Sequence, residues 1–230
     1  MKFKIGLALL LFSLAPVVFA DELVANGGFE SYTGSNVPAT WSFSGGTVWS
    51  TPSLTSLIGS GTIDPFSGSR MGVLAPYGSA DTWIWQDVDF TGYTSATLSF
   101  MWKYDALDLN ELDNGIDNFE VWISDQGQQF GDRILRYNIN LSPSDGHVIG
   151  DWMFASISGD VSDLDKVTFT FRLLNYSPGG EGDWNTAGFG QVTALYLDDI
   201  SIIATPEPAS ILLLGTGLSV IGLAVWRRRK

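Results

Sequence analysis

The chain has 230 residues, no cysteine and one histidine, and its formal net charge is −13 at pH 7. Six of its 12 Lys and Arg residues, and all but one of its 25 Asp and Glu residues, lie between residues 21 and 204, so this part carries a net charge of −18. Such a charge repels nucleic acids and anionic lipids, which excludes nucleic-acid binding. The lack of cysteine excludes disulfides and thiol catalysis, and it leaves most zinc and copper sites without ligands.

The first twenty residues have the pattern of a secretory signal peptide. The chain opens on the positive segment MKFK, continues with the apolar run 5–14, and reaches a small-x-Ala cleavage site that ends at Ala20. Signal peptidase removes such a segment during export, so it is not part of the mature fold. The sequence therefore predicts a signal peptide over 1–20 and one domain over 21–204, a length that suits a single β-sandwich.

Strand patterns fill the domain, and none of it keeps a helical period. Many strands without crossover helices predict an all-β fold of antiparallel sheets packed face to face. Pro- and Gly-rich intervals are predicted loops at 140–151 and 174–190. His147 falls in the first of them, where we expect an exposed side chain and find no nucleophile-elbow motif. The clearest strands alternate apolar and polar residues, at 98–104, 119–123 and 167–173.

The last predicted strand, 194–203, changes its apolar parity at Asp198-Asp199. Two leucines before this pair and two isoleucines after it would lie on opposite faces of a regular strand. A β-bulge at the pair would bring all four to the core and redirect one carboxylate, which makes Asp198 and Asp199 a candidate cation site. The alternative is a solvated acidic pair at a strand bend.

Several short motifs resemble those of carbohydrate-binding-module-like proteins. The resemblance implies a galactose-binding-domain-like fold, an antiparallel jelly-roll β-sandwich. Members of this group often bind a structural Ca²⁺ between the first and last strands. Carried over by position, Glu30 and one of Asp198 or Asp199 would be its ligands, and oxygen ligands suit this ion. The motifs are LVANGGFES at 23–31 with Trp41 after it, SGSRMGVL at 67–74, WIWQDVDFTGYTSATLSFMWKY at 83–104 and LYLDDISI at 195–202.

A pair of tryptophans is the candidate ligand site. Trp83 and Trp85 share a strand face with two aspartates, and aromatic rings beside polar groups suit a pyranose ring. An inward pair that fills the core is the alternative. Trp122 and Trp184 are further candidates.

Carboxylates are dense over 105–120, DALDLNELDNGIDNFE, which predicts a solvated acidic loop or, as the alternative, a second cation site. Because acidic residues are so abundant, no particular pair indicates a glycoside hydrolase. We therefore expect no catalytic residues and no enzymatic activity.

The tail, 205–230, has three consecutive parts. Pro206-Glu207-Pro208 precedes the apolar run 209–226, which would be about 27 Å long as a helix and so predicts a single transmembrane helix. Three arginines and a lysine follow, and they would stay on the cytoplasmic side. This order resembles the PEP-CTERM sorting signal, also called the ice-binding protein C-terminal domain. The resemblance implies a sorting motif made of Pro206, Glu207, Pro208, Arg227, Arg228 and Arg229.

In that family an exosortase, a transpeptidase-like membrane protease, is thought to recognise the triplet and remove the helix. We therefore predict a membrane-anchored precursor that is exported and ends at the cell surface or outside the cell. The predicted role is structural or interactive in the envelope or extracellular matrix. The alternative is a carbohydrate-binding module that recognises an extracellular polysaccharide. Ice binding is not predicted, because the domain lacks a regular Thr-rich repeat.

Overall fold

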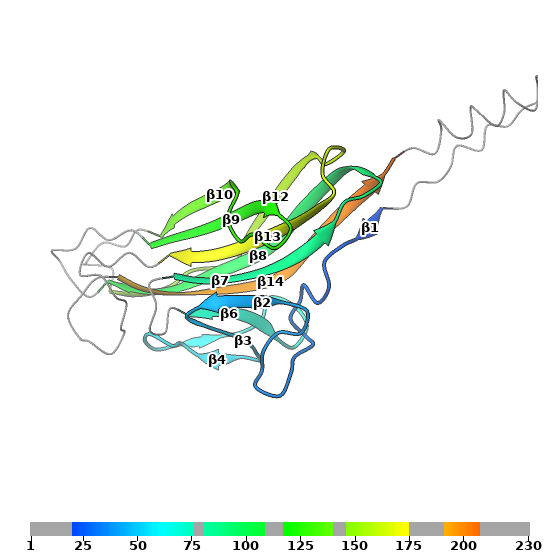
Figure 1. Cartoon of the computed structure of the whole chain (residues 1–230). Helices are drawn as coiled ribbons and strands as arrows, with labels where there is room; N and C mark the ends of the chain where they lie inside the picture. The colour runs from blue at the N-terminus through cyan, green and yellow to red at the C-terminus, as the bar shows by residue number, and fades with distance from the viewer. Residues whose placement is uncertain (1–19, 76–80, 109–116, 140–145, 175–190, 208–230) are drawn as a thin grey trace, which may run out of the picture.

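The computed structural model describes residues 20–75, 81–108, 117–139, 146–174 and 191–207. Within these ranges the chain forms β-strands and no helix, which confirms the all-β prediction (Figure 1). The strands are β1 (Asp21–Glu22), β2 (Ser42–Gly45), β3 (Thr47–Thr51), β4 (Leu54–Thr55), β5 (Thr62–Ile63), β6 (Met71–Ala75), β7 (Asp81–Asp89), β8 (Tyr93–Asp108), β9 (Asp117–Asp125), β10 (Asp132–Ile139), β11 (His147–Ile149), β12 (Met153–Asp160), β13 (Lys166–Leu174) and β14 (Gln191–Pro206).

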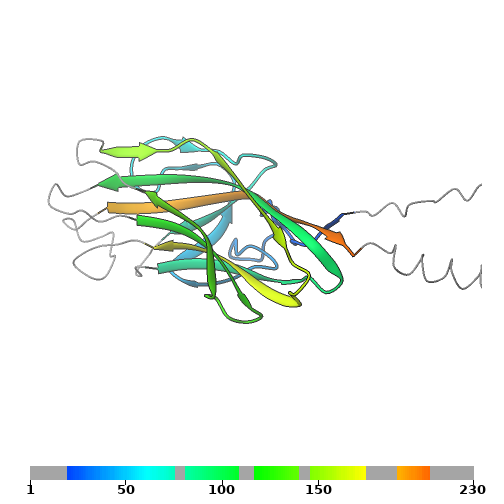
Figure 2. The same ribbon diagram turned by 90° about the horizontal axis from the view of Figure 1, so that it is seen from above.

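Two antiparallel sheets form the body of the molecule. The seven-stranded sheet has the order β11-β8-β14-β6-β3, with β1 also on β14 and β12 also on β8. The five-stranded sheet has the order β10-β9-β13-β7-β2, and β4 and β5 form a separate hairpin. From β6 to β9 each strand passes to the other sheet, as in a jelly roll, and so do β12, β13 and β14. Figure 2 shows the long strands β8 and β14 running the length of the molecule.

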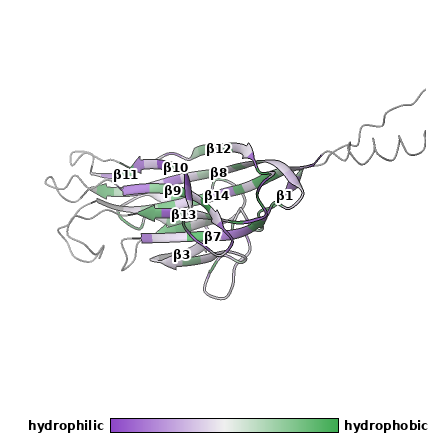
Figure 3. Cartoon of the chain, turned by 45° about the horizontal axis from the view of Figure 1, so that its top comes forward, coloured by the Kyte–Doolittle hydropathy of each residue, from purple (hydrophilic) through white to green (hydrophobic). Residues whose placement is uncertain are grey.

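The main core lies between the two sheets, and the long strands direct every second residue toward it. The predicted strands at 98–104, 119–123 and 167–173 are confirmed as parts of β8, β9 and β13. Their inward phenylalanines meet in the centre, with ring centroids 5.1 Å apart for Phe100 and Phe171 and 5.8 Å apart for Phe100 and Phe119. Hydrophobic residues alternate with polar ones along these strands (Figure 3), because one face of each sheet is buried.

A second, smaller core covers part of the outer face of the seven-stranded sheet. Met71, Val73 and Tyr196 are fully buried there, together with Ile63 of the hairpin. The segment between β3 and β6 lies over them and adds Leu54, Leu57 and Ile58 to the cluster. Much of this outer face is therefore used for packing, whereas the outer face of the five-stranded sheet carries no such cluster of buried apolar side chains among the described residues.

The predicted β-bulge is confirmed in β14. The register between β14 and β8 shifts between Asp198 and Ser201, and Asp199 has a positive φ of 48°. As a result, both leucines before the pair and both isoleucines after it are buried in the main core. The extra residue also separates the two carboxylates, since Asp198 is fully buried and Asp199 is exposed.

The interpretation of His147 as an exposed loop residue is wrong. His147 begins β11, which pairs with β8, and its side chain is only 19% exposed. Its Nε2 atom lies 2.6 Å from Oδ1 of Asp105. A partner 42 residues away in sequence draws this segment into the sheet, and no local pattern reveals that contact.

The solvated acidic loop predicted over 105–120 is also wrong for its described part. Asp105 lies in β8, Asp117 and Glu120 lie in β9, and all three are buried. The burial of Asp105 and Glu120 is compensated by distant donors, since Ser56 donates a hydrogen bond to Asp105 and Arg133 donates one to Glu120. The middle of the segment, 109–116, lies outside the described residues.

The two ends of the described chain leave the sandwich side by side. β1 pairs with the end of β14, with Asp21 opposite Ala204 (Figure 1). The predicted signal peptide, except for Ala20, and the predicted helix at 209–226 lie outside the described residues. The described part of the chain contains no helical segment with the length and hydrophobicity that a membrane span requires.

Candidate functional site

Trp83 and Trp85 point outward from the five-stranded sheet. β7 buries Thr82, Ile84, Gln86 and Val88 toward the core, and it leaves both tryptophans half-buried on the other face. Asp87 and Asp89 share this outward face, as the alternation predicts. The structure therefore places the pair on the surface and not in the main core, while a role in ligand binding stays a prediction.

Strand register brings a third tryptophan to the same surface. Thr170 of β13 is paired with Trp85 on one side and with Trp122 on the other. Two residues further along β13, Arg172 is paired with Trp83 and with Glu120. We call this surface the tryptophan face: Trp83, Trp85, Trp122, Thr170, Arg172 and Glu120. Trp122 points outward, as the alternation along its strand predicts. Trp184, the remaining candidate, lies outside the described residues.

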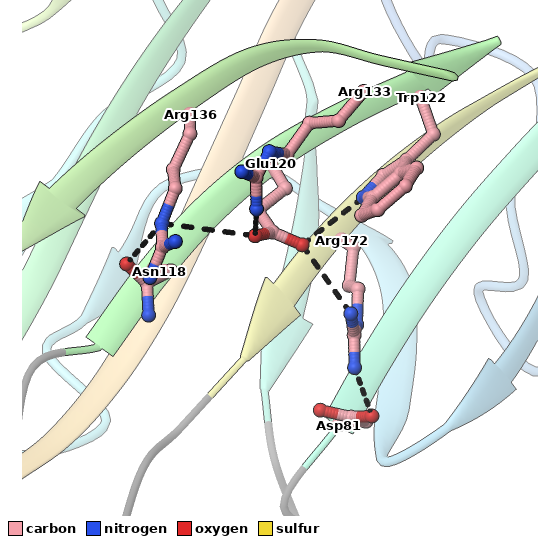
Figure 4. Close-up of polar contacts among 7 residues, drawn as sticks. All are labelled: Asp81, Asn118, Glu120, Trp122, Arg133, Arg136 and Arg172. Carbon is pink, nitrogen blue, oxygen red and sulfur yellow. Dashed lines mark hydrogen bonds and ion pairs between the residues drawn. The ribbon is translucent and has the colours of Figure 1, made fainter. Parts of the chain in front are cut away.

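A buried carboxylate organises the polar part of the tryptophan face (Figure 4). The Glu120 side chain is 3% exposed, and its Oε1 accepts a hydrogen bond of 2.8 Å from Nη1 of Arg133. Its Oε2 accepts bonds from Nε1 of Trp122 at 3.0 Å and from Nη1 of Arg172 at 3.3 Å. Nε of Arg136 lies 3.8 Å from Oε1. These donors compensate the desolvation of a buried charge.

An aromatic side chain from the turn between β9 and β10 lies against this network. The Phe130 ring is 5.5 Å from the Trp83 ring and 5.6 Å from the Trp122 ring. The Arg172 guanidinium lies 4.9 Å from the centre of the Phe130 ring, at a cation–π distance. Phe130 itself is 39% exposed, so part of its ring lies on the surface beside the outward tryptophans.

Three buried polar atoms of the tryptophan face have no hydrogen-bond partner among the described residues: Nε1 of Trp83, Oγ1 of Thr170 and Nε of Arg172. Each of these atoms can donate a hydrogen bond. A buried donor without a partner costs about 1–3 kcal/mol. An acceptor oxygen from water or from a ligand would therefore be favourable at this place.

The sequence did not point to Arg172 or Phe130 as site residues, and it included Glu120 only in the alternative second cation site at 105–120. Alternation along 167–173 does place Arg172 outward, and one further signal was available: three of the six Lys and Arg residues between 21 and 204 gather around Glu120. That gathering depends on the register of three strands, so it becomes visible only in the folded chain. Phe130 carries no signal at all, since it sits in a turn.

The residues predicted to bind calcium come together around one turn. The side chains of Glu30, Asp198 and Asp199 approach Gly28, where a Cβ atom would lie 3.8 Å from Oδ1 of each aspartate and 3.9 Å from Cγ of Glu30. Their oxygens accept hydrogen bonds from the segment 66–70. Among the described residues, no group of three or more His, Cys, Asp or Glu side chains is arranged to hold a metal ion.

The same hydrogen bonds affect the acidity of these carboxyl groups. Burial raises the pKa of Asp198 to about 6, although the N–H groups of Phe66, Ser67 and Asp199 partly oppose this. Burial also acts to raise the pKa of Glu30, but the hydrogen bonds from Ser69 and Arg70 outweigh it and lower this pKa. Asp198 is thus a buried carboxyl group whose charge is poorly compensated.

The contact between His147 and Asp105 does not form a catalytic triad. A triad requires the aspartate and the nucleophile to contact different ring nitrogens of the histidine. Here Nε2 of His147 lies 2.6 Å from Asp105 and 3.1 Å from Oγ of Ser56, and the Ser56 hydroxyl donates to Asp105. Tyr196 also donates to Asp105, and burial together with that carboxylate raises the pKa of Tyr196. The cluster fastens β11 and the segment after β4 to the sheet.

The fold and its tail together define an all-β sandwich protein with a C-terminal sorting segment. The PEP-CTERM protein-sorting motif matches residues 204–230, which confirms the motif identified in the tail. The match includes Pro206, Glu207, Pro208 and the terminal arginines. No curated protein matches the sequence.

Several solved structures are similar in fold. The carbohydrate-binding module TmCBM61, solved with β-1,4-galactotriose, is 13% identical, with a TM-score of 0.47 over 80% of this chain and 99% of that one. The K3 adhesin domain of Lys-gingipain from Porphyromonas gingivalis is 15% identical, with a TM-score of 0.48 over 80% and 98%. The CBM22-1 xylan-binding domain of Paenibacillus barcinonensis Xyn10C is 16% identical, with a TM-score of 0.38 over 83% and 98%. At these values the similarities do not indicate what this chain binds.

Proposed function

We propose that this protein is exported, is sorted to the cell envelope through its tail by an exosortase-type enzyme, and binds an extracellular polysaccharide there without catalysis. The sorting part is supported by the match at 204–230, because the PEP-CTERM motif is a protein-sorting signal. The negative charge of the domain is compatible with this role, since it disfavours adsorption to anionic lipids after release.

The binding part is carried by one observation, the tryptophan face. Sugar rings stack their C–H faces on aromatic rings, and their hydroxyl groups need donors and acceptors beside those rings. Trp83, Trp85 and Trp122 supply the rings, while Arg172 and Glu120 lie between them.

Replacement of Trp85 tests the binding site. No ring contact holds this side chain among the described residues, so we expect Trp85→Ala to fold normally. Its affinity for the recognised polysaccharide should fall by about tenfold or more, equivalent to about 1.4 kcal/mol. The measurement is affinity electrophoresis or calorimetry against a panel of neutral and acidic polysaccharides, with reducing-end release assayed in parallel.

A matched control lies on the other sheet. Phe154 of β12 is an aromatic residue that is 68% exposed, and Phe154→Ala should leave binding unchanged. Equal affinity of Trp85→Ala and the wild type would contradict the proposed binding surface. Turnover of a polysaccharide would contradict the non-catalytic role.

We further propose that Glu30, Asp198 and Asp199 hold a structural Ca²⁺. The donor chemistry fits, because this ion takes carboxylate and carbonyl oxygens. The buried charge of Asp198 has no ion-pair partner among the described residues, so a cation would compensate it. The carboxylate oxygens that accept hydrogen bonds from residues 66–70 would then also coordinate the ion, or would exchange some of these hydrogen bonds for it.

Chelation tests the calcium proposal. Saturation of one site at a hundred times its Kd stabilises a fold by about 2.7 kcal/mol, so EDTA should lower the Tm of residues 21–207 by about 5–10 °C. Added Ca²⁺ should restore the Tm, and Asp198→Asn should remove the response. A Tm that EDTA leaves unchanged would overturn the proposal.

A further inference from the structure

The sorting motif begins inside the sandwich. β14 runs to Pro206, with Thr205 opposite Ser95 and Pro206 opposite Tyr93. The N–H of Glu207 then donates a hydrogen bond of 2.9 Å to the carbonyl of Gly92, in the turn between β7 and β8. Two of the three residues of Pro-Glu-Pro are therefore held against the domain, and a single residue separates Glu207 from the apolar run.

The strand that leads to the motif is also held on its other side. β1 pairs Asp21 with Ala204 and Glu22 with Ile203. The Glu22 carboxylate accepts hydrogen bonds from the N–H of Ile202 and from the Ser201 hydroxyl. Both edges of β14 are thus occupied just before the motif, one by β8 and one by β1.

An enzyme that encloses an extended peptide in its own binding cleft needs the backbone free on both edges and room around the side chains. While residues 205–207 stay paired, one edge of their backbone is occupied by the start of β8 and by the turn between β7 and β8. We infer that this pairing gates processing: the exosortase acts on the minor state in which 205–207 have separated from residues 92–95. The inference rests on the proposed sorting function and adds a conformational step to it.

Opening at this end is a local event. Ala204 is fully buried, but Thr205 and Glu207 are exposed and Pro206 is only partly covered. Separation of 205–207 therefore exposes little apolar surface and leaves the core intact, as fraying of strand ends generally does. Because only the open fraction is competent, the rate of processing falls in proportion to that fraction.

A disulfide lock tests the inference in the full-length chain. Ser95 and Thr205 are Cα partners in adjacent strands, both exposed and both outside the triplet. The double variant Ser95→Cys/Thr205→Cys can form one disulfide without competition, because the chain has no cysteine. In cells with an active exosortase, the oxidised variant should accumulate as precursor. Because the disulfide reduces the fraction of open molecules, processing should be at least about tenfold slower than in the wild type.

Three comparisons make the result decisive. Reduction of the disulfide should restore processing. The single variant Ser95→Cys should be processed like the wild type. An insertion of six Gly and Ser residues between Ala204 and Thr205 should make processing faster. Processing of the locked chain at the wild-type rate would overturn the gate while leaving the sorting function in place. A wild-type chain whose intact mass still includes the tail would overturn the sorting function, and the gate with it.

Discussion

Replacing Glu120 with alanine should lower the free energy of unfolding by about 3 kcal/mol, the lower end of the range for breaking a buried ion pair, because two of its arginine partners are solvated. The Glu120 side chain is 3% exposed and contacts three arginines. Without it, Arg172, whose side chain is 19% exposed, keeps Asp81 as its ion-pair partner, while the side chains of Arg133 and Arg136, which are 39% and 44% exposed, stay in contact with water. Urea unfolding of residues 21–207 measures the change, provided that the slope with denaturant stays constant.

Two further variants identify the cause of this loss. Asp125→Ala removes a carboxylate from the exposed end of the same strand, and it should change the stability by no more than about 0.5 kcal/mol. Glu120→Gln keeps the size and one acceptor oxygen but removes the charge, so its loss should fall between the other two. If Glu120→Ala were as mild as Asp125→Ala, the arginines would not depend on this carboxylate.

The second large effect is expected at Gly27, where two backbone segments touch. A Cβ atom there would lie 1.7 Å from the carbonyl oxygen of Ile200, and that oxygen belongs to rigid backbone beside the bulge. The N–H of Ile200 donates to the carbonyl of Gly27 at 3.1 Å, so any retreat of the chain also weakens this bond. We expect Gly27→Ala to cost about 3 kcal/mol, the upper part of the range for overpacking.

Gly34 provides the control for this substitution. A Cβ atom at Gly34 meets no atom within 4 Å, and its φ is not positive. Gly34→Ala should therefore be neutral, or stabilising by up to about 1 kcal/mol through a less flexible unfolded chain. Thermal unfolding of both variants, with and without Ca²⁺, measures the two effects. A normal Tm for Gly27→Ala would mean that the N-terminal segment does not pack against the bulge.

Periodicity alone was enough to predict the body of the fold. The alternation at 167–173 placed Phe169 and Phe171 in the core, because a strand with one buried face has a period of two. The parity change at Asp198-Asp199 predicted a bulge for the same reason, and the structure confirms it. The sorting motif was equally local, since Pro-Glu-Pro, an apolar run and terminal arginines follow one another directly.

Only the tertiary structure decided which residues share a surface. Trp122, Arg172 and Trp83 come from three strands, and strand register makes them neighbours. The tertiary structure also shows that Asp105 and Glu120, which the sequence placed in a loop, are buried. Their hydrogen-bond donors lie far away in sequence, so no local pattern indicates this burial.

For the same reason, the sequence did not predict that the sorting motif pairs with the start of β8 and the turn before it. Nothing between Thr205 and Pro208 indicates that Gly92 and Ser95 pair with it. Local patterns report which face of a strand is buried, since that depends on neighbouring residues in the chain. They do not report strand partners, since hydrogen bonds between strands depend on how the whole chain closes on itself.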